Sequence, residues 1–135
     1  MWKVMLADDE KSIRTALGTL IDWQSLDCEV VYMARSGQDV LDHIGQYRPD
    51  LLITDIRMPG VDGVELANRL SGSELPIPII FLTAYTDFSY AQAAVRYSVA
   101  DYIVKPNVLE ELPQAIRRIQ ERFGMQPAEQ RRRIQ

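Results

Sequence analysis

The chain has 135 residues, of which 47% are hydrophobic and 25% are charged, and its formal net charge is −4. This length and composition are typical of one globular domain, and the acidic balance argues against a general attraction of the body of the chain to nucleic acid. No apolar run approaches the roughly 18 residues of a membrane span, and the single cysteine, Cys28, excludes an internal disulfide. We therefore expect a cytoplasmic protein.

Short apolar runs alternate with helical patterns along the chain. The apolar runs predict strands at 3–7, 28–34, 51–55, 77–83 and 101–105. Several of these runs are continuous rather than alternating, as in parallel strands that helices cover on both faces. Apolar residues three and four positions apart predict a helix after each strand. In the last of these helices, Pro113 is expected in the first turn, where proline is tolerated.

Five strands alternating with five helices predict an α/β fold with a doubly wound parallel sheet. The helical periodicity ends near Phe123, and residues 123–135 are polar. We therefore expect one domain over residues 1–122, followed by a linker or the start of a missing output domain. The segment RRRIQ at the end has no aromatic residues between its arginines, so it is a weak indication of nucleic-acid binding.

Polar side chains follow four of the predicted strands, at the edge where doubly wound sheets collect functional groups. Asp8 and Asp9 follow the first strand, Asp55 ends the third, Thr83 ends the fourth, and Lys105 ends the fifth. If the first and third strands are neighbours, the three carboxylates repel one another, and a hard divalent cation such as Mg²⁺ relieves that repulsion. The alternative for the acidic triplet is a simple favourable interaction with a helix N-terminus.

The hydroxyl of Thr83 and the ammonium of Lys105 favour a specific use of this edge. A metal, a hydroxyl and an ammonium around a carboxylate suit a phosphoryl group bound to that carboxylate. Asp55 would then be the nucleophile, and Mg²⁺ and Lys105 would offset charge during in-line transfer.

The segments DDE at 8–10, TDIRMPGVDG at 54–63, TA at 83–84 and DYIVKP at 101–106 resemble the receiver domain of two-component response regulators. The resemblance extends over about residues 2 to 122. It implies a flavodoxin-like fold with strand order 2-1-3-4-5, phosphorylation by a sensor histidine kinase, and Mg²⁺ as the cofactor. It also implies a domain that catalyses only its own phosphorylation and dephosphorylation and is therefore not a turnover enzyme.

The resemblance assigns a role to each matching residue. The roles implied are phosphoacceptor for Asp55, direct Mg²⁺ ligand for Asp9, Mg²⁺ ligand largely through water for Asp8, Mg²⁺ ligand through its backbone carbonyl for Arg57, switch hydroxyl for Thr83, switch aromatic for Tyr102 and phosphate-pairing cation for Lys105. The family also has a cis peptide bond between the residues that correspond to Lys105 and Pro106. A further hypothesis is that the bulky Tyr85, two residues after Thr83, slows loss of the phosphoryl group.

The segments IDWQSLDCEVV at 21–31 and 83–106 are similar to receivers attached to AraC-type helix-turn-helix output domains. We therefore expect that the chain is part of a longer transcription factor, which contacts DNA only through that output domain. Pairing of two phosphorylated receivers is left open. One alternative is a stand-alone receiver that acts by protein docking. Others are a Mg²⁺-dependent phosphatase, although Arg57 replaces its second carboxylate, and a flavin-binding relative, although DDEKS has the wrong charge for a phosphate loop.

Overall fold

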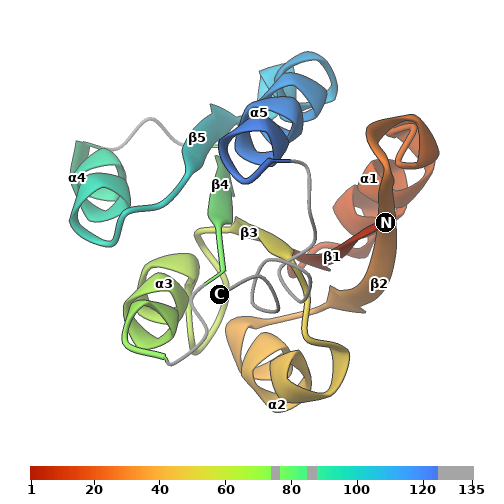
Figure 1. Cartoon of the computed structure of the whole chain (residues 1–135). Coiled ribbons are helices and arrows are strands. Elements are labelled where there is room, and N and C mark those ends of the chain that lie inside the picture. Colours follow the sequence, from red (N-terminus) through yellow and green to blue (C-terminus); the bar gives the residue numbers. More distant parts are fainter. Residues whose placement is uncertain (74–76, 85–87, 125–135) are drawn as a thin grey trace.

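A computed structural model describes residues 1–73, 77–84 and 88–124 of the chain. Five parallel strands form one sheet in the order β2-β1-β3-β4-β5 (Figure 1). The strands are β1 (Trp2–Ala7), β2 (Cys28–Ala34), β3 (Leu51–Asp55), β4 (Ile79–Thr83) and β5 (Asp101–Val104). The predicted α/β class and the strand order that the resemblance implied are both confirmed.

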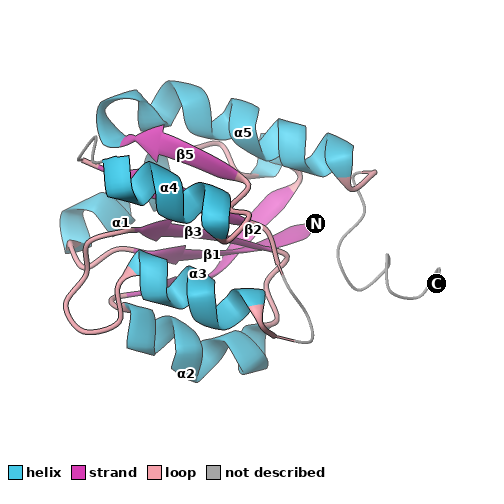
Figure 2. Ribbon diagram, turned by 90° about the vertical axis from the view of Figure 1, so that its left-hand side faces the viewer, coloured by secondary structure: helices cyan, strands magenta, loops and turns pink. Residues whose placement is uncertain are grey.

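The helices lie on both faces of this sheet, as Figures 1 and 2 show. The helices are α1 (Lys11–Leu20), α2 (Gly37–Tyr47), α3 (Gly63–Ser71), α4 (Phe88–Arg96) and α5 (Val108–Arg122), with short 3₁₀ turns η1 (Gln24–Leu26) and η2 (Lys105–Asn107). Helices α1 and α5 cover one face, and α2, α3 and α4 cover the other. No helix in the described part of the chain combines the length and the apolar character that crossing a membrane requires.

Each face of the sheet has its own hydrophobic core. Trp2, Ile53 and Ile116 belong to the core under α1 and α5, whereas Leu52 and Phe81 belong to the core under α2, α3 and α4. All residues of β3 and β4 are buried, which explains why their sequences are continuous apolar runs rather than alternating ones. These two buried strands therefore carry their last residues to the carboxyl edge of the sheet on a well-packed support.

Side chains at helix starts fix where α2 and α3 begin. The Ser36 hydroxyl accepts a hydrogen bond from the Asp39 N–H at 3.0 Å, and an Asp62 carboxylate oxygen accepts one from the Glu65 N–H at 2.8 Å. Such caps satisfy backbone donors that have no partner within the helix. The cap of α3 is important for the site below, because α3 follows the loop that leaves β3.

Two local predictions were wrong. Pro113 lies in the second turn of α5, since the helix begins directly after η2, at Val108. Its missing N–H leaves the carbonyl of Leu109 without the usual helical donor, and Leu109 is an exposed residue. The strand predicted at 77–83 begins only at Ile79, because Pro78 has no N–H to donate to a sheet. Tyr85 and residues 125–135 lie outside the described residues.

Candidate functional site

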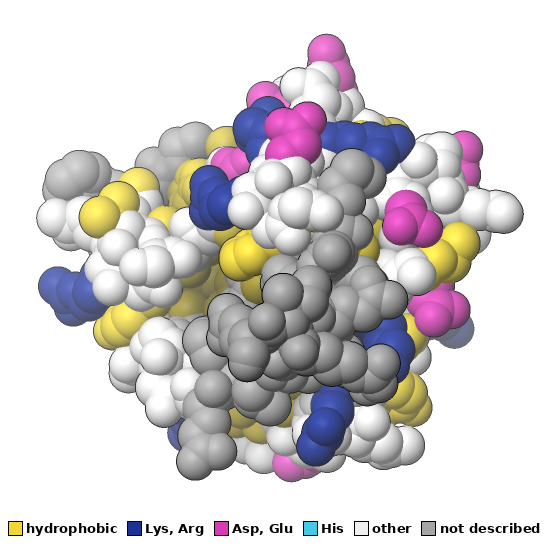
Figure 3. All heavy atoms as spheres, in the orientation of Figure 1, with side chains coloured by type: hydrophobic (Ala, Val, Ile, Leu, Met, Phe, Trp, Pro, Cys, Tyr) yellow, Lys and Arg dark blue, Asp and Glu magenta, His cyan; other side chains and the backbone are white. Residues whose placement is uncertain are grey.

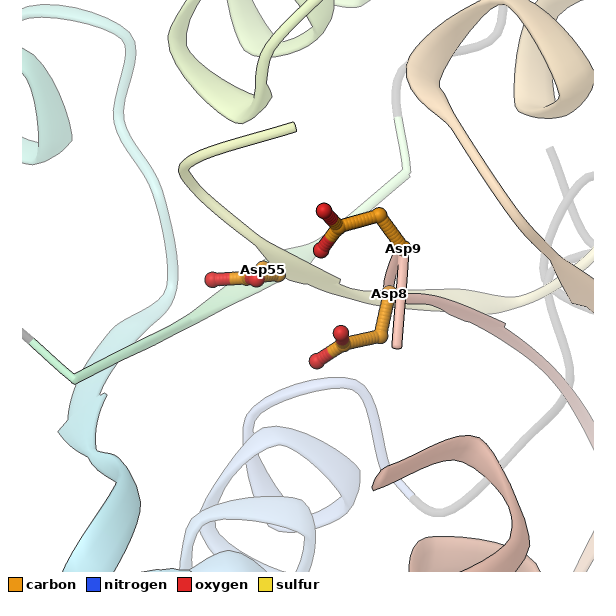
Figure 4. Close-up of side chains that lie close together, drawn as sticks. All are labelled: Asp8, Asp9 and Asp55. Atoms are coloured by element: carbon orange, nitrogen blue, oxygen red, sulfur yellow. The ribbon is translucent and has the colours of Figure 1, made fainter. Parts of the chain in front are cut away.

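Three carboxylates lie together at the carboxyl edge of the sheet. Asp8 and Asp9 follow β1, and Asp55 ends β3, the strand that pairs with β1 with Ala7 opposite Thr54. One carboxylate oxygen from each of the three lies within 4.8 Å of the others (Figure 4). The pairing of β1 with β3 therefore brings together the three acidic groups that the sequence places at strand ends.

The acidic cluster is largely buried and contains one positive charge. Asp8 is 1% exposed and Asp55 is 6% exposed, whereas Asp9 is exposed. The ammonium nitrogen of Lys105 lies 3.1 Å from Asp8 Oδ2 and 3.2 Å from Asp55 Oδ2. Because one cation faces three carboxylates, the site keeps an excess of negative charge, which favours a further cation.

The surroundings of Asp55 disfavour its ionised form. Burial raises the pKa of the Asp55 carboxyl above its ordinary value of 3.8, and the nearby Asp8 raises it further, while Lys105 opposes both effects. Burial alone would lower the pKa of the Lys105 ammonium, but the carboxylates of Asp8 and Asp55 outweigh burial and raise it. Lys105 therefore stays protonated and holds the two buried carboxylates together.

The loop after β3 is closed tightly around the backbone of Asp55. The Ile56 N–H donates to Asp55 Oδ1 at 2.8 Å, and the Gly63 N–H donates to the Ile56 carbonyl at 2.8 Å. A Cβ atom at Gly63 would lie 2.7 Å from the Asp55 carbonyl oxygen and 2.8 Å from Ile56 Cα, so only glycine fits this close approach. These contacts leave Asp55 Oδ2 directed at Lys105.

Asp8 makes further hydrogen bonds, one of which sequence reasoning missed. Its Oδ1 accepts from the Glu10 N–H at 2.9 Å, and its backbone carbonyl accepts from Arg14 Nη1 at 2.7 Å. The buried Asp8 Oδ2 contacts Lys105 by charge but lacks a hydrogen bond of good geometry. The only available signal for Arg14 was its position, one helical turn after the acidic triplet.

Thr83 and Tyr102 lie on the strands next to Asp55. Thr83 is the buried last residue of β4, and its neighbour Leu82 pairs with Asp55 across β3 and β4. Tyr102 is the second residue of β5, where it pairs with Phe81 and packs, half-buried, against the core under α2, α3 and α4. Thr83 therefore shares the edge of the carboxylates, whereas Tyr102 lies further back along the sheet.

The Lys105–Pro106 peptide bond is trans, and no cis peptide bond occurs in the described part of the chain. The expected cis bond is therefore wrong for this structure. Trans is the intrinsically preferred form even before proline. Pro106 also lies in the first positions of the turn η2, where the fixed backbone angle of a proline fits.

The oxygen atoms at this edge suit a hard divalent cation. Asp8, Asp9 and Asp55 offer carboxylate oxygens within a small space, and Mg²⁺ prefers such ligands together with water. Arg57 follows two residues after Asp55 on the same loop. The Arg57 side chain points to α4, where its Nε donates to the Tyr90 hydroxyl at 2.6 Å. Because a guanidinium is a cation without an acceptor atom, only the backbone carbonyl of Arg57 is a candidate ligand.

Comparison with known proteins identifies a family and several relatives. A sequence model of the response regulator receiver domain matches residues 4–117. The transcriptional regulatory protein HptR of Staphylococcus aureus (strain NCTC 8325 / PS 47) is 41% identical over 106 residues, which cover 78% of this chain and 41% of HptR. The uncharacterized transcriptional regulatory protein YesN of Bacillus subtilis (strain 168) is 36% identical over 106 residues, which cover 78% of this chain and 29% of YesN.

A solved structure shows the same fold. The REC domain of AraT, a response regulator from Geobacillus stearothermophilus, superposes with a TM-score of 0.78 at 36% sequence identity, covering 90% of this chain and 96% of that chain. The present chain spans less than half the length of the curated relatives described above. The match over most of the sequence, together with the shared fold, shows that the chain belongs to the response regulator receiver domain family.

Proposed function

We propose that this chain is a phosphorylation-dependent signalling switch that accepts a phosphoryl group from a sensor histidine kinase onto Asp55. The observation that carries the proposal is the Lys105 ammonium shared between two buried carboxylates, with Asp9 completing the acidic cluster. Burying a carboxylate beside other carboxylates destabilises the fold. Such an arrangement is therefore expected where the charges have a function. Membership in the receiver family supports the same reading.

The proposed chemistry needs few groups. Asp55 Oδ2 attacks the phosphorus of the donor in line, an oxygen–phosphorus bond forms, and the bond from phosphorus to the donor atom breaks with its electron pair leaving on the donor. Lys105 pairs with a phosphoryl oxygen, and the Thr83 hydroxyl lies at the same edge to donate to another. When bound by Asp8, Asp9, Asp55 and the Arg57 carbonyl, Mg²⁺ supplies charge neutralisation.

The proposed output is a change of surface rather than a released product. Thr83 moves toward the new phosphoryl oxygen, and Tyr102 then turns inward against the space that Thr83 vacates. Because β5 carries Tyr102 between α4 and α5, this movement changes the surface formed by α4, β5 and α5. Two phosphorylated copies could then pair through that surface. In this proposal the domain has no substrate turnover beyond its own phosphorylation and dephosphorylation.

The proposed full-length protein is a transcription factor with an AraC-type output domain. The transcriptional regulators HptR and YesN are longer than this chain, which supports an output domain in the complete protein. The structure of a DNA-binding response regulator of the LuxR family from Staphylococcus aureus also superposes, with a TM-score of 0.78 at 28% identity, so the type of output domain is the part to test. We do not propose DNA contact by the described residues. Figure 3 shows acidic and basic side chains interspersed around α5, whereas a DNA-binding surface needs clustered basic residues.

The test is phosphorylation by a small donor. The protein is incubated with Mg²⁺ and acetyl phosphate, and its intact mass is measured for the wild type, Asp55→Asn and the control Asp50→Asn. We expect the mass increase of one phosphoryl group in the wild type and in Asp50→Asn, but not in Asp55→Asn. Omitting Mg²⁺ should abolish the increase. A phosphoryl group that still appears in Asp55→Asn would contradict the proposed acceptor.

A further inference from the structure

We propose that Arg14 is a positioning residue for the metal site, because it ties the backbone on both sides of Asp9 to the start of α1. The inference rests on the proposed function, since it concerns the Mg²⁺ that the acidic cluster would bind. The Arg14 side chain offers no ligand atom, because a guanidinium has donors but no acceptor. It acts only through the backbone that carries Asp8 and Asp9.

Arg14 makes two hydrogen bonds with the segment that carries the acidic triplet. Its Nη1 donates to the Asp8 carbonyl at 2.7 Å, and its backbone N–H donates to the Glu10 carbonyl at 3.1 Å. Asp8 and Glu10 are the residues on either side of Asp9 in the sequence, so one residue holds both neighbours of Asp9. The bond to Glu10 is an ordinary helical bond, whereas the bond to Asp8 needs a long side chain with a donor at its end.

The Asp8 carbonyl needs such a donor because Asp8 lies where strand pairing stops. The Asp8 N–H still donates to the Ala34 carbonyl at 3.1 Å, but Ala34 is the last residue of β2, so that strand does not continue the ladder. Asp8 is 1% exposed, which gives water little access to its backbone. A buried carbonyl without a donor destabilises the fold. Arg14 supplies the donor that β2 no longer supplies.

Asp9 depends on this backbone more than the other two carboxylates do. Asp8 and Asp55 are buried and share the Lys105 ammonium, whereas Asp9 is exposed and is not one of the two carboxylates in those ion pairs. Figure 4 shows Asp8 and Asp9 leaving the same short segment, with both carboxylates on the side of Asp55. A shift of this segment would move two candidate ligands at once, and Mg²⁺ demands nearly ideal ligand geometry.

The charge and the hydrogen bond of Arg14 have opposite effects on Mg²⁺ binding, which makes the role testable. The guanidinium lies beside the acidic cluster, since its Nη1 contacts the Asp8 carbonyl. Its positive charge repels a second cation, so removal of the charge alone should strengthen Mg²⁺ binding. Its hydrogen bond holds the segment with two ligands, so removal of the bond should weaken Mg²⁺ binding. We infer that the effect of the hydrogen bond is the larger one.

The test measures Mg²⁺ affinity without any phosphodonor, from the amide NMR signals of the β3–α3 loop during a Mg²⁺ titration. Arg14→Met keeps an apolar stem but removes the donor and the charge, and we expect it to bind Mg²⁺ about fivefold more weakly than the wild type. Arg14→Lys keeps a cationic donor for a single hydrogen bond and should stay within about twofold of the wild type. The matched control Lys11→Met removes an exposed positive charge from the same helix and should bind Mg²⁺ no more weakly than the wild type.

Each result decides the inference. Equal or tighter Mg²⁺ binding by Arg14→Met overturns it, since the charge would then be the larger effect. An equal loss in Arg14→Lys or in Lys11→Met also overturns it, because the hydrogen bond to Asp8 would not be the cause. If Arg14→Met fails to fold, the shorter and neutral Arg14→Gln makes the same comparison. All these results leave the proposed function intact, whereas a wild-type protein without any Mg²⁺ response contradicts the metal site and therefore both proposals.

Discussion

Two buried aspartates flank the same strand and have opposite surroundings. Asp50 precedes β3 and is 4% exposed, and Asp55 ends β3 and is 6% exposed. The Asp50 carboxylate accepts a hydrogen bond from the Lys3 N–H at 2.8 Å, and its own N–H donates to the Lys3 carbonyl at 2.7 Å. Asp55 instead faces Asp8, Asp9 and a lysine that it shares with Asp8.

The comparison teaches that burial alone does not identify a functional carboxylate. At the amino end of β3, the Asp50 side chain satisfies a backbone donor of the neighbouring strand and fixes the pairing of β1 with β3. At the carboxyl end, three carboxylates are brought together at an energetic cost to the fold. Asp50 therefore stabilises the fold, whereas Asp55 belongs to a site in which the ligand-free fold is under electrostatic strain.

The largest expected loss of stability comes from removing the Lys105 ammonium at the carboxyl end of β3. Lys105→Met leaves two buried carboxylates without their shared partner, so we expect the free energy of unfolding in the absence of Mg²⁺ to fall by about 2–3 kcal/mol. Adding Mg²⁺ should recover part of that loss, because the metal binds the folded state. Chemical denaturation with and without Mg²⁺ measures both effects. The exposed Lys11→Met on α1 is the control, and an equal loss in both variants would refute the argument.

The next largest effect is expected at Asp50, at the amino end of β3, where the carboxylate is hydrogen-bonded. Asp50→Ala leaves the Lys3 N–H without its acceptor, so the free energy of unfolding should fall by about 1–2 kcal/mol. Asp50→Asn keeps an acceptor oxygen at the same place and should lose clearly less. Neither change should respond to Mg²⁺, in contrast to Lys105→Met. Denaturation midpoints of the three proteins decide this, and a Mg²⁺-dependent recovery of Asp50→Ala would remove the distinction between the two ends.

The carboxylate cluster was predictable from the sequence for a simple geometric reason. Parallel strands end at the same edge of a sheet, so once the apolar runs locate the strands, Asp8, Asp9 and Asp55 must lie near that edge. The continuous apolar sequence of β3 likewise predicts a strand buried on both faces, and the structure confirms it. The order of strands and the edge at which they end were therefore predictable, whereas the start of β4 and the position of Pro113 in α5 were not.

The contacts that the sequence did not reveal depend on side-chain direction or on precise helix starts. Arg14 and Arg57 are long side chains with many rotamers, and their partners are selected by tertiary structure rather than by local spacing. The link from Arg57 to Tyr90 joins the loop after β3 to the first turn of α4, and only the folded sheet brings these two segments together. Pro113 was misplaced by a single turn because the preceding 3₁₀ turn leaves no signal separate from that of the helix.

The smallest expected change in the free energy of unfolding is that of Asp55→Asn. It is the most informative one, because this substitution should stabilise the protein whereas the others destabilise it. Since the pKa of Asp55 is raised above 3.8 in the folded protein, the ionised carboxylate disfavours folding. The contribution of this group to stability is present below its ordinary pKa and is lost as the pH rises through the raised value. Asp55→Asn removes the charge, so at neutral pH without Mg²⁺ we expect it to be more stable than the wild type by up to about 1 kcal/mol.

The pH dependence separates this effect from ordinary changes in packing. The advantage of Asp55→Asn should vanish below about pH 3, where the wild-type carboxyl is protonated. It should shrink or reverse when Mg²⁺ is added, because the neutral amide oxygen of the variant is a weaker ligand than a carboxylate. Thermal unfolding from acid to neutral pH, with the exposed Asp42→Asn as control, measures the difference. An advantage that is constant with pH would arise from packing and would show that the carboxylate cluster is not strained.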